Sequence, residues 1–177
     1  MPVTRAPLSL KARAIGLLAQ REHSRAELRR KLLRIEQEQK RRARLADAAA
    51  AESAPGDEPP DDDTACAEAA ESAVDALLDT LAAEGYLDET RFVESRLHLR
   101  SGRFGAQRIQ QELAQHGLRL DAEQQAQLRA TELERAREVW LRRFGPEPAA
   151  EPVERARQTR FLLARGFAAD VVRRLLR

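Results

Sequence analysis

The chain has 177 residues, of which 42% are hydrophobic and 34% are charged, and its formal net charge is +2. A single cysteine excludes an internal disulfide framework, and no apolar run has the length of a membrane span or of a signal peptide. We therefore expect a cytoplasmic protein without a membrane partner. Leu and Ala supply most of the apolar residues and enter helices at little cost, so the composition predicts an all-α fold.

The charges are unevenly distributed along the sequence. Residues 5–44 contain thirteen Lys and Arg against four Asp and Glu, whereas residues 45–90 contain fourteen Asp and Glu and no Lys or Arg. Residues 91–177 contain eighteen Arg and eleven Asp and Glu. Two basic regions thus flank one acidic region, and a basic surface attracts polyanions or acidic protein faces.

A first helix-turn-helix unit is predicted over residues 8–35, after a flexible N-terminus over residues 1–7. Apolar residues at helical spacing predict a helix over residues 8–21. Ser24 and Glu27 then form a capping box, in which each side chain accepts a hydrogen bond from the other residue's backbone amide. This capping box predicts the start of the second helix.

Residues 36–71 form an acidic, Ala-rich insert that we expect to be disordered. The segment combines proline, glycine and clustered aspartates. Such a composition cannot bury enough apolar surface to offset the entropy cost of ordering the chain.

A middle helical repeat is predicted over residues 72–120 and a C-terminal helical repeat over residues 121–177. Gly85 is expected to end one helix, because glycine adopts the left-handed conformation without penalty and the following apolar residues pack back. Asp121 and Gln124 resemble another capping box. Helices are predicted over residues 72–84, 89–101, 106–116, 152–165 and 169–177, with two more between residues 121 and 144.

One helix-turn-helix pattern recurs three times without gaps, over Ala14–Leu33, Ser95–Ala114 and Gln158–Arg177. The apolar positions fall into register; Leu18, Leu99 and Leu162 coincide, as do Leu28, Ile109 and Val172. Such repetition is typical of stacked helical units, whose function resides on a shared surface.

The sequence offers little support for catalysis, and we expect no enzyme activity, no metal and no cofactor. Glu94 and His98 are spaced to share a helix face, but no further ligand has metal-site spacing. His23 precedes a helix cap, where a packed hinge residue is expected rather than a general base. The segment from Gly102 to Gly105 lacks the Lys-Ser/Thr of a phosphate loop.

The arginines are the candidate contact residues. Most cations in the folded regions are Arg, which suits bidentate contact with phosphates or carboxylates. Each single arginine also has a simpler interpretation as part of a solvated helix face with a Glu partner. The candidate set, chosen by charge and placement, is Arg25, Arg29, Arg30, Arg96, Arg100, Arg103, Arg108, Arg165, Arg173 and Arg174.

Four segments of the sequence resemble successive motifs of the RecX family, the bacterial regulators of the RecA recombinase. They are REHSRAELRRKL (21–32), EGYLDETRFVESRL (84–97), RFGAQRIQQELAQHGL (103–118) and RARQTRFLLARGF (155–167). The resemblance implies three tandem three-helix repeats with about nine helices, in an elongated, curved protein that we expect to be a monomer. It also implies a regulator that binds RecA–DNA filaments and limits their extension, ATP hydrolysis, strand exchange and co-protease activity.

Two questions stay open at the level of the sequence. The acidic insert, which is longer than the family's usual connection, either competes with DNA for the basic faces or is a neutral insertion that costs little free energy. The basic surface either contacts the RecA filament together with single- or double-stranded DNA phosphates, or binds nucleic acid directly without a recombinase. A scaffold for another partner is a third alternative.

Overall fold

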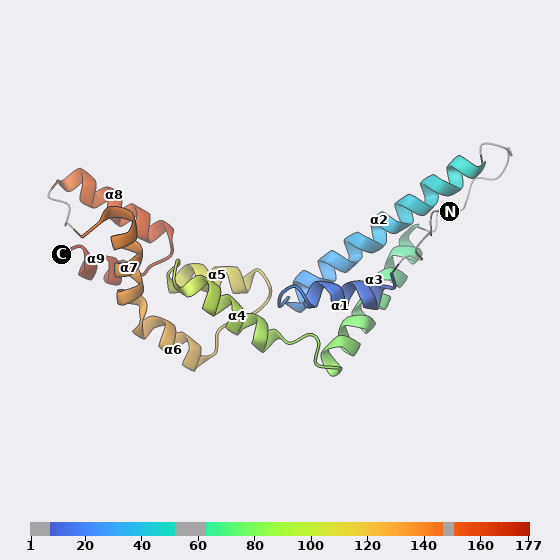
Figure 1. The fold of residues 1–177 in the computed structure, drawn as a ribbon, viewed down its shortest axis with the longest axis horizontal. Coiled ribbons are helices and arrows are strands. Elements are labelled where there is room, and N and C mark those ends of the chain that lie inside the picture. The colour runs from blue at the N-terminus through green and yellow to red at the C-terminus, as the bar shows by residue number, and fades with distance from the viewer. Residues whose placement is uncertain (1–7, 52–62, 147–150) are drawn as a thin grey trace, which may run out of the picture. The chain divides into compact units, whose positions relative to one another are not determined.

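The computed structural model describes residues 8–51, 63–146 and 151–177. These residues form α-helices joined by short turns, with no strand among them (Figure 1), which confirms the predicted all-α fold. The nine helices of the described ranges are α1 (Leu10–Leu18), α2 (Arg25–Ala51), α3 (Asp63–Ala83), α4 (Glu89–Ser101), α5 (Ala106–Ala114), α6 (Ala122–Ala130), α7 (Glu132–Phe144), α8 (Pro152–Ala164) and α9 (Ala169–Leu175).

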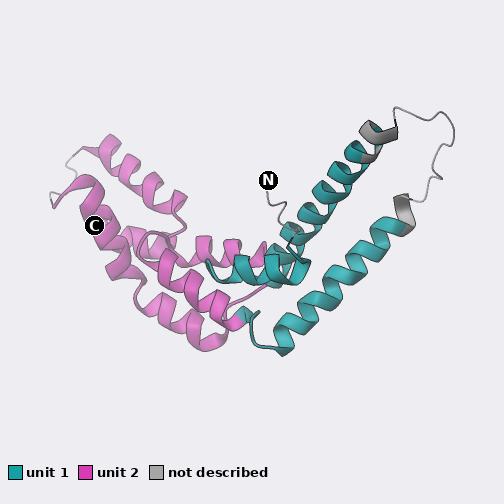
Figure 2. Ribbon diagram, turned by 45° about the vertical axis from the view of Figure 1, so that its right-hand side comes forward, with its two compact units in different colours: residues 1–89 teal, residues 90–177 magenta. Residues whose placement is uncertain are grey.

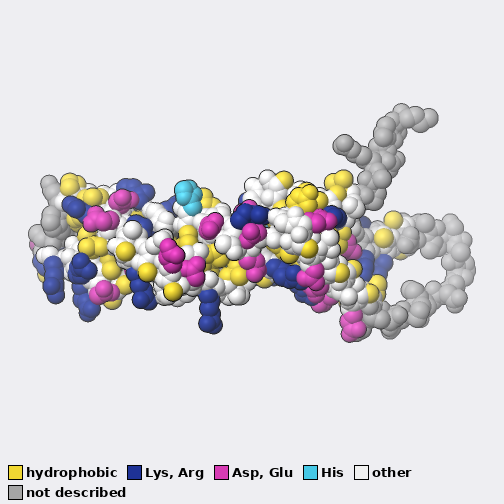
Figure 3. All heavy atoms as spheres, turned by 90° about the horizontal axis from the view of Figure 1, so that it is seen from below, with side chains coloured by type: hydrophobic (Ala, Val, Ile, Leu, Met, Phe, Trp, Pro, Cys, Tyr) yellow, Lys and Arg dark blue, Asp and Glu magenta, His cyan; other side chains and the backbone are white. Residues whose placement is uncertain are grey.

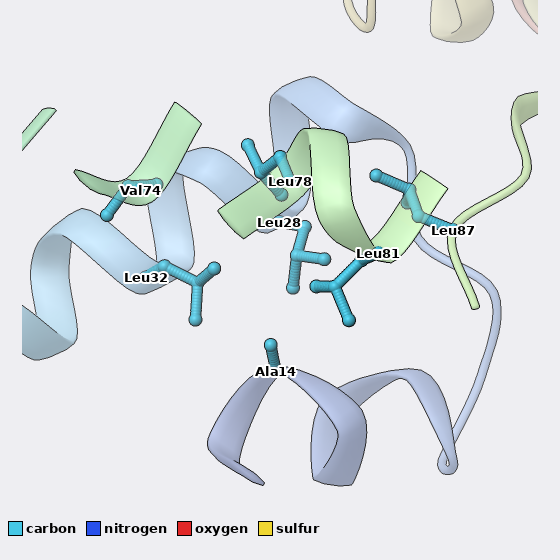
Figure 4. Packing of buried hydrophobic residues seen from close by; sticks show 7 residues of the cluster. All are labelled: Ala14, Leu28, Leu32, Val74, Leu78, Leu81 and Leu87. Carbon is cyan, nitrogen blue, oxygen red and sulfur yellow. The ribbon is translucent and has the colours of Figure 1, made fainter. Parts of the chain in front are cut away.

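The chain divides into two compact units, residues 1–89 and residues 90–177 (Figure 2). In the first unit, α1, α2 and α3 enclose one apolar cluster (Figure 4), whose buried members are Ala14, Leu28, Leu32, Val74, Leu78, Leu81 and Leu87. Leu28 and Leu32 are one helical turn apart on α2, as Val74 and Leu78 are on α3, so each helix presents one apolar stripe to the cluster.

Local signals set the ends of these helices. The Ser9 hydroxyl accepts a hydrogen bond from the Ala12 amide at 3.2 Å, and the Ser24 hydroxyl accepts one from the Glu27 amide at 3.1 Å. Gly85, with φ of 75°, ends the turn after α3, and the Leu87 amide donates to the Leu81 carbonyl at 3.1 Å. Leu87 therefore packs back onto the cluster, as predicted for a glycine-terminated helix.

The structure corrects the predicted boundaries of the disordered insert. Helix α2 continues to Ala51 and α3 begins at Asp63, so helix replaces the predicted disorder over residues 36–51 and 63–71. Ala, Glu, Lys and Arg are strong helix formers, and the Lys40 ammonium donates to the Cys66 carbonyl at 3.0 Å between the two helices. The rest of the insert, and the N-terminus predicted to be flexible, lie outside the described residues.

The grouping of helices also differs from the prediction. Helix α3, most of which falls in the predicted middle repeat over residues 72–120, packs with α1 and α2 in the first unit. The apolar stripe of α3 packs against that of α2. Without α3, helices α1 and α2 would leave part of the α2 stripe exposed to water. The middle group of three helices is therefore α4 to α6.

The second unit contains two apolar clusters, each built by three consecutive helices. Helices α4 to α6 bury Phe92, Val93, Ala106, Ile109, Leu113 and Leu128. Helices α7 to α9 bury Ala136, Val139, Trp140, Leu162, Phe167, Val171 and Val172. The recurrent pattern thus occupies the first two helices of the earlier groups and the last two of the final group. This shift explains why Leu162 is fully buried while Leu99, at the same position of the pattern, is 62% exposed.

Two turns of the second unit lie backbone against backbone. The Gly105 amide donates to the Arg165 carbonyl at 2.9 Å, and the Gln107 amide donates to the Gly166 carbonyl at 3.2 Å. A Cβ atom on Gly105 would lie 2.2 Å from the Gly166 oxygen. The turn before α5 and the turn after α8 thus approach so closely that position 105 accepts only glycine.

Glu132, in the first turn of α7, links the same two turns from the side. Its side chain is buried, and Oε1 accepts hydrogen bonds from the Ala106 amide at 3.0 Å and the Ala168 amide at 3.3 Å. These amides lie at the N-termini of α5 and α9, where helices leave donors without an internal partner. A negative charge is also favourable there because the helix dipoles point their positive ends at it.

Arg135, one turn further along α7, fixes the end of α4 and the turn after it. Its guanidinium donates to the carbonyls of Ser101 and Phe104, both at 2.9 Å, and to that of Leu128 at 2.6 Å. Burial lowers the pKa of Arg135. Two charged side chains of α7 therefore fix the turn that contains Arg103. Glu132 accepts a hydrogen bond at the end of this turn, and Arg135 donates hydrogen bonds to its carbonyls.

We predict that Gly105→Ala lowers the free energy of unfolding of the second unit by about 2 kcal/mol, because the new methyl group overpacks a backbone contact. Urea unfolding followed by the fluorescence of Trp140, the chain's single tryptophan, measures it. Gly102→Ala is the matched control: no atom lies within 4 Å of a Cβ placed there, so its effect should stay within about 0.5 kcal/mol. Equal effects of the two variants would contradict the close approach.

We predict that Glu132→Ala destabilises the second unit by about 2 kcal/mol or more, because buried amides lose their acceptor. Glu132→Gln retains an oxygen at that place and should lose less. Glu134→Ala removes an exposed carboxylate from the same helical turn and controls for the charge near the helix N-terminus. The assignment fails if Glu132→Ala unfolds at the same urea concentration as Glu134→Ala.

Candidate functional site

Two candidate arginines of α2 are engaged by the acidic side of α3. The Arg25 guanidinium lies 2.7 Å from the Asp79 carboxylate. Arg29 contacts Asp75 at 2.7 Å and Glu71 at 2.8 Å. The hydrogen bond to Asp75 raises the pKa of Arg29, and the same bond lowers the pKa of Asp75. The positive charge of α2 is therefore partly neutralised within the first unit.

Arg30 is exposed on the same helix and donates to the Ala26 carbonyl at 3.3 Å. This bond stays within the helix, so it leaves most of the guanidinium donors directed at solvent. Of the three candidates on α2, Arg30 thus keeps its charge most accessible.

The structure brings three candidates of the second unit together around the ring of Phe104. The guanidinium carbons of Arg100, Arg108 and Arg165 lie 5.4, 5.7 and 5.9 Å from the ring centroid. They come from α4, α5 and the turn after α8, and cation–π attraction favours this arrangement. Glu112 offsets part of the charge, because its carboxylate lies 3.0 Å from Arg100 and 3.8 Å from Arg108.

Three further candidates of the second unit, Arg96, Arg173 and Arg174, have other surroundings. Arg96 lies over the ring of Phe92, with its guanidinium carbon 5.1 Å from the centroid. Arg173 and Arg174 are exposed in the last turn of α9. Figure 3 shows Lys and Arg side chains projecting from the surface, interleaved in places with Asp and Glu. Within the second unit, these candidates are thus spread over more than one basic patch.

Arg142 and Arg143, at the end of α7, were missed by the sequence argument. With Arg103, Arg165 and three uncharged residues they line a cavity of about 230 Å³, which we call the arginine pocket. Arg142 donates to the carbonyl of Glu138 at 3.3 Å and to that of Gly102 at 2.8 Å. The sequence signal that could have indicated them is the pair of adjacent arginines in the last turn of α7.

The structure places His23 in a buried turn and the Glu94–His98 pair on the surface of a helix. His23 is buried in the turn between α1 and α2, with Nδ1 3.3 Å from the Glu27 carboxylate. Glu94 and His98 are exposed on α4. In the described part of the chain, no three His, Cys, Asp or Glu residues are grouped closely enough to hold a metal ion. None of the helices described is both long and apolar enough to cross a membrane.

Comparison with known proteins identifies the family. A sequence model of the third three-helix domain of RecX matches residues 130–176, the segment that forms α7 to α9. The chain is 44% identical over 178 residues to the regulatory protein RecX of Ralstonia pickettii, covering 99% of this chain and 91% of the relative. It is 45% identical to that of Leptothrix cholodnii, covering 100% and 93%.

A more distant relative aligns over a similar length. The regulatory protein RecX of Pseudomonas putida is 38% identical over 175 residues, which cover 96% of this chain and 90% of the relative. Identity of this level across nearly complete chains, together with three groups of three helices in the described residues, places the protein: it belongs to the RecX family of regulatory proteins.

Proposed function

We propose that this protein regulates a RecA recombinase in the cytoplasm, mainly as an inhibitor and without enzyme activity of its own. In this proposal it binds RecA–DNA filaments and limits their extension, and so reduces ATP hydrolysis, strand exchange and co-protease activity. The observation that carries the proposal is the identity of 44% to 46% with proteins named regulatory protein RecX, over nearly the whole of both chains.

The charge distribution supports contact with an anionic filament. In the described residues, Arg173 and Arg174 have no carboxylate within ion-pairing distance, and both are exposed. Solvated charges of one sign attract a polyanionic partner and accelerate its association. Several separate basic patches would each contribute a weak contact, and contacts on one chain add through their high effective concentration.

The experiment that tests the proposal is the ATPase activity of a RecA recombinase on single-stranded DNA, titrated with this protein. We expect inhibition well below one molecule per recombinase monomer, because a protein that acts on filament ends affects many subunits. Inhibition that begins only when the protein saturates the DNA would contradict it. That result would favour direct nucleic-acid binding, whose affinity falls steeply with salt.

A pair of variants tests the basic surface in the same assay. Arg173→Glu with Arg174→Glu should raise the concentration needed for half inhibition about tenfold, equivalent to about 1.4 kcal/mol. The control, Arg137→Glu with Arg160→Glu, reverses two exposed charges of the same unit outside the candidate set. If both variants inhibit as strongly as the wild type while remaining folded, the α9 arginines are not part of the contact.

A further inference from the structure

The arginine pocket gathers four positive side chains from three segments of the second unit. Arg103 lies in the turn between α4 and α5, Arg142 and Arg143 at the end of α7, and Arg165 directly after α8. The other lining residues are Gly102, Val139 and Phe161, so no acidic residue lines the cavity. Throughout the described residues, no carboxylate lies within 4.0 Å of any of these four guanidinium groups.

Two of the four guanidinium groups are held in place by the backbone. Arg142 donates to the carbonyls of Glu138 and Gly102, and Arg165 donates to the Arg103 carbonyl at 3.2 Å. The Arg165 guanidinium also stacks on Phe161, 4.5 Å from the ring centroid. A guanidinium has five N–H donors, so both groups keep donors for a ligand. Because both side chains are already fixed, a ligand would bind without the entropy cost of ordering them.

The pocket also depends on the close contact between turns. Arg103 follows the end of α4, which Arg135 anchors, and Arg165 precedes Gly166, whose carbonyl accepts from Gln107. Positive charges held together without a counter-charge repel one another and reduce stability. Arg25 and Arg29 of the first unit, by contrast, have carboxylate partners. No lining residue of the pocket supplies a negative charge, and a bound anion would supply it.

We propose that the arginine pocket binds backbone phosphates of a DNA strand. This inference rests on the proposed function and names the filament component that this surface contacts. A single carboxylate of a protein partner neutralises one charge, whereas successive phosphates of one strand carry one charge each and match the guanidinium fork. The Phe161 ring is occupied by Arg165 and by the edge of Phe144, so the contact is with phosphates rather than stacked bases.

The test is the binding of a fluorescein-labelled oligothymidylate, measured by anisotropy without recombinase over a range of salt concentrations. The pocket variant is Arg103→Ala with Arg143→Ala, two exposed residues that line the cavity. The control, Arg137→Ala with Arg160→Ala, removes the same charge from exposed positions of α7 and α8 that do not line it. Helicity and Trp140 fluorescence establish that each variant is folded, and Arg143→Ala alone serves if the double variant is not.

We expect the pocket variant to bind the oligonucleotide about tenfold more weakly, because charge-assisted hydrogen bonds to phosphate are lost. The slope of log K against log salt should fall by about 1.4 in magnitude, at about 0.7 for each phosphate contact with a single strand. The control should change affinity by less than about twofold, because exposed charges away from the contact are screened by salt.

Equal losses in the two variants would overturn the proposal, because only total charge would then matter. Unchanged oligonucleotide binding with weakened inhibition of the recombinase would also overturn it, and would assign the pocket to an acidic protein surface. Failure of the proposed function has a different outcome, since the wild-type protein would then leave recombinase ATPase unaffected while the pocket variant still lost affinity for DNA.

Discussion

A buried carboxylate holds the second unit together. Glu132 lies in α7 but satisfies backbone amides at the starts of α5 and α9, two helices that belong to different apolar clusters. An unpartnered amide or carboxylate in this place would cost more than the hydrogen bonds contribute. The carboxylate on α7 thereby links the turn before α5 to the segment that precedes α9.

The same arrangement begins in the first unit. Arg25 opens α2 as Ala106 opens α5, and its amide donates to Oε1 of Glu89 at 3.3 Å. Glu89 is in the first turn of α4, as Glu132 is in that of α7. In both units, then, a carboxylate from the first turn of a helix accepts a hydrogen bond from the amide that opens another helix.

The positive charges have different surroundings in the two units. On α2, Arg25 and Arg29 face carboxylates of α3, which lowers their attraction for an external anion. In the second unit, Glu112 partly offsets the cluster around Phe104, while the arginine pocket has no acidic lining. Among the described residues, the lining of the arginine pocket is therefore less compensated by carboxylates than Arg25 and Arg29 are.

The sequence by itself determined those features of the helices that depend only on residues close together in the chain. Helical periodicity, the Asp121–Gln124 capping box, which the structure shows in full, and the glycine after α3 involve residues within a few positions of one another. Their physical causes, hydrogen bonds within one turn and a positive φ, are present in any short segment of that sequence. The RecX motifs could likewise be recognised residue by residue, and the comparisons confirm that family.

Only the tertiary structure decided which distant segments meet. Arg103 and Arg142 line the same pocket although 39 positions separate them. Helix α3 packs in the first group because its apolar stripe is buried there against α1 and α2. Leu99 and Leu162 hold the same place in the pattern, yet one is exposed and one is buried. Such differences follow from packing between helices, which depends on the shape and charge of the partner surface and is not encoded in local spacing.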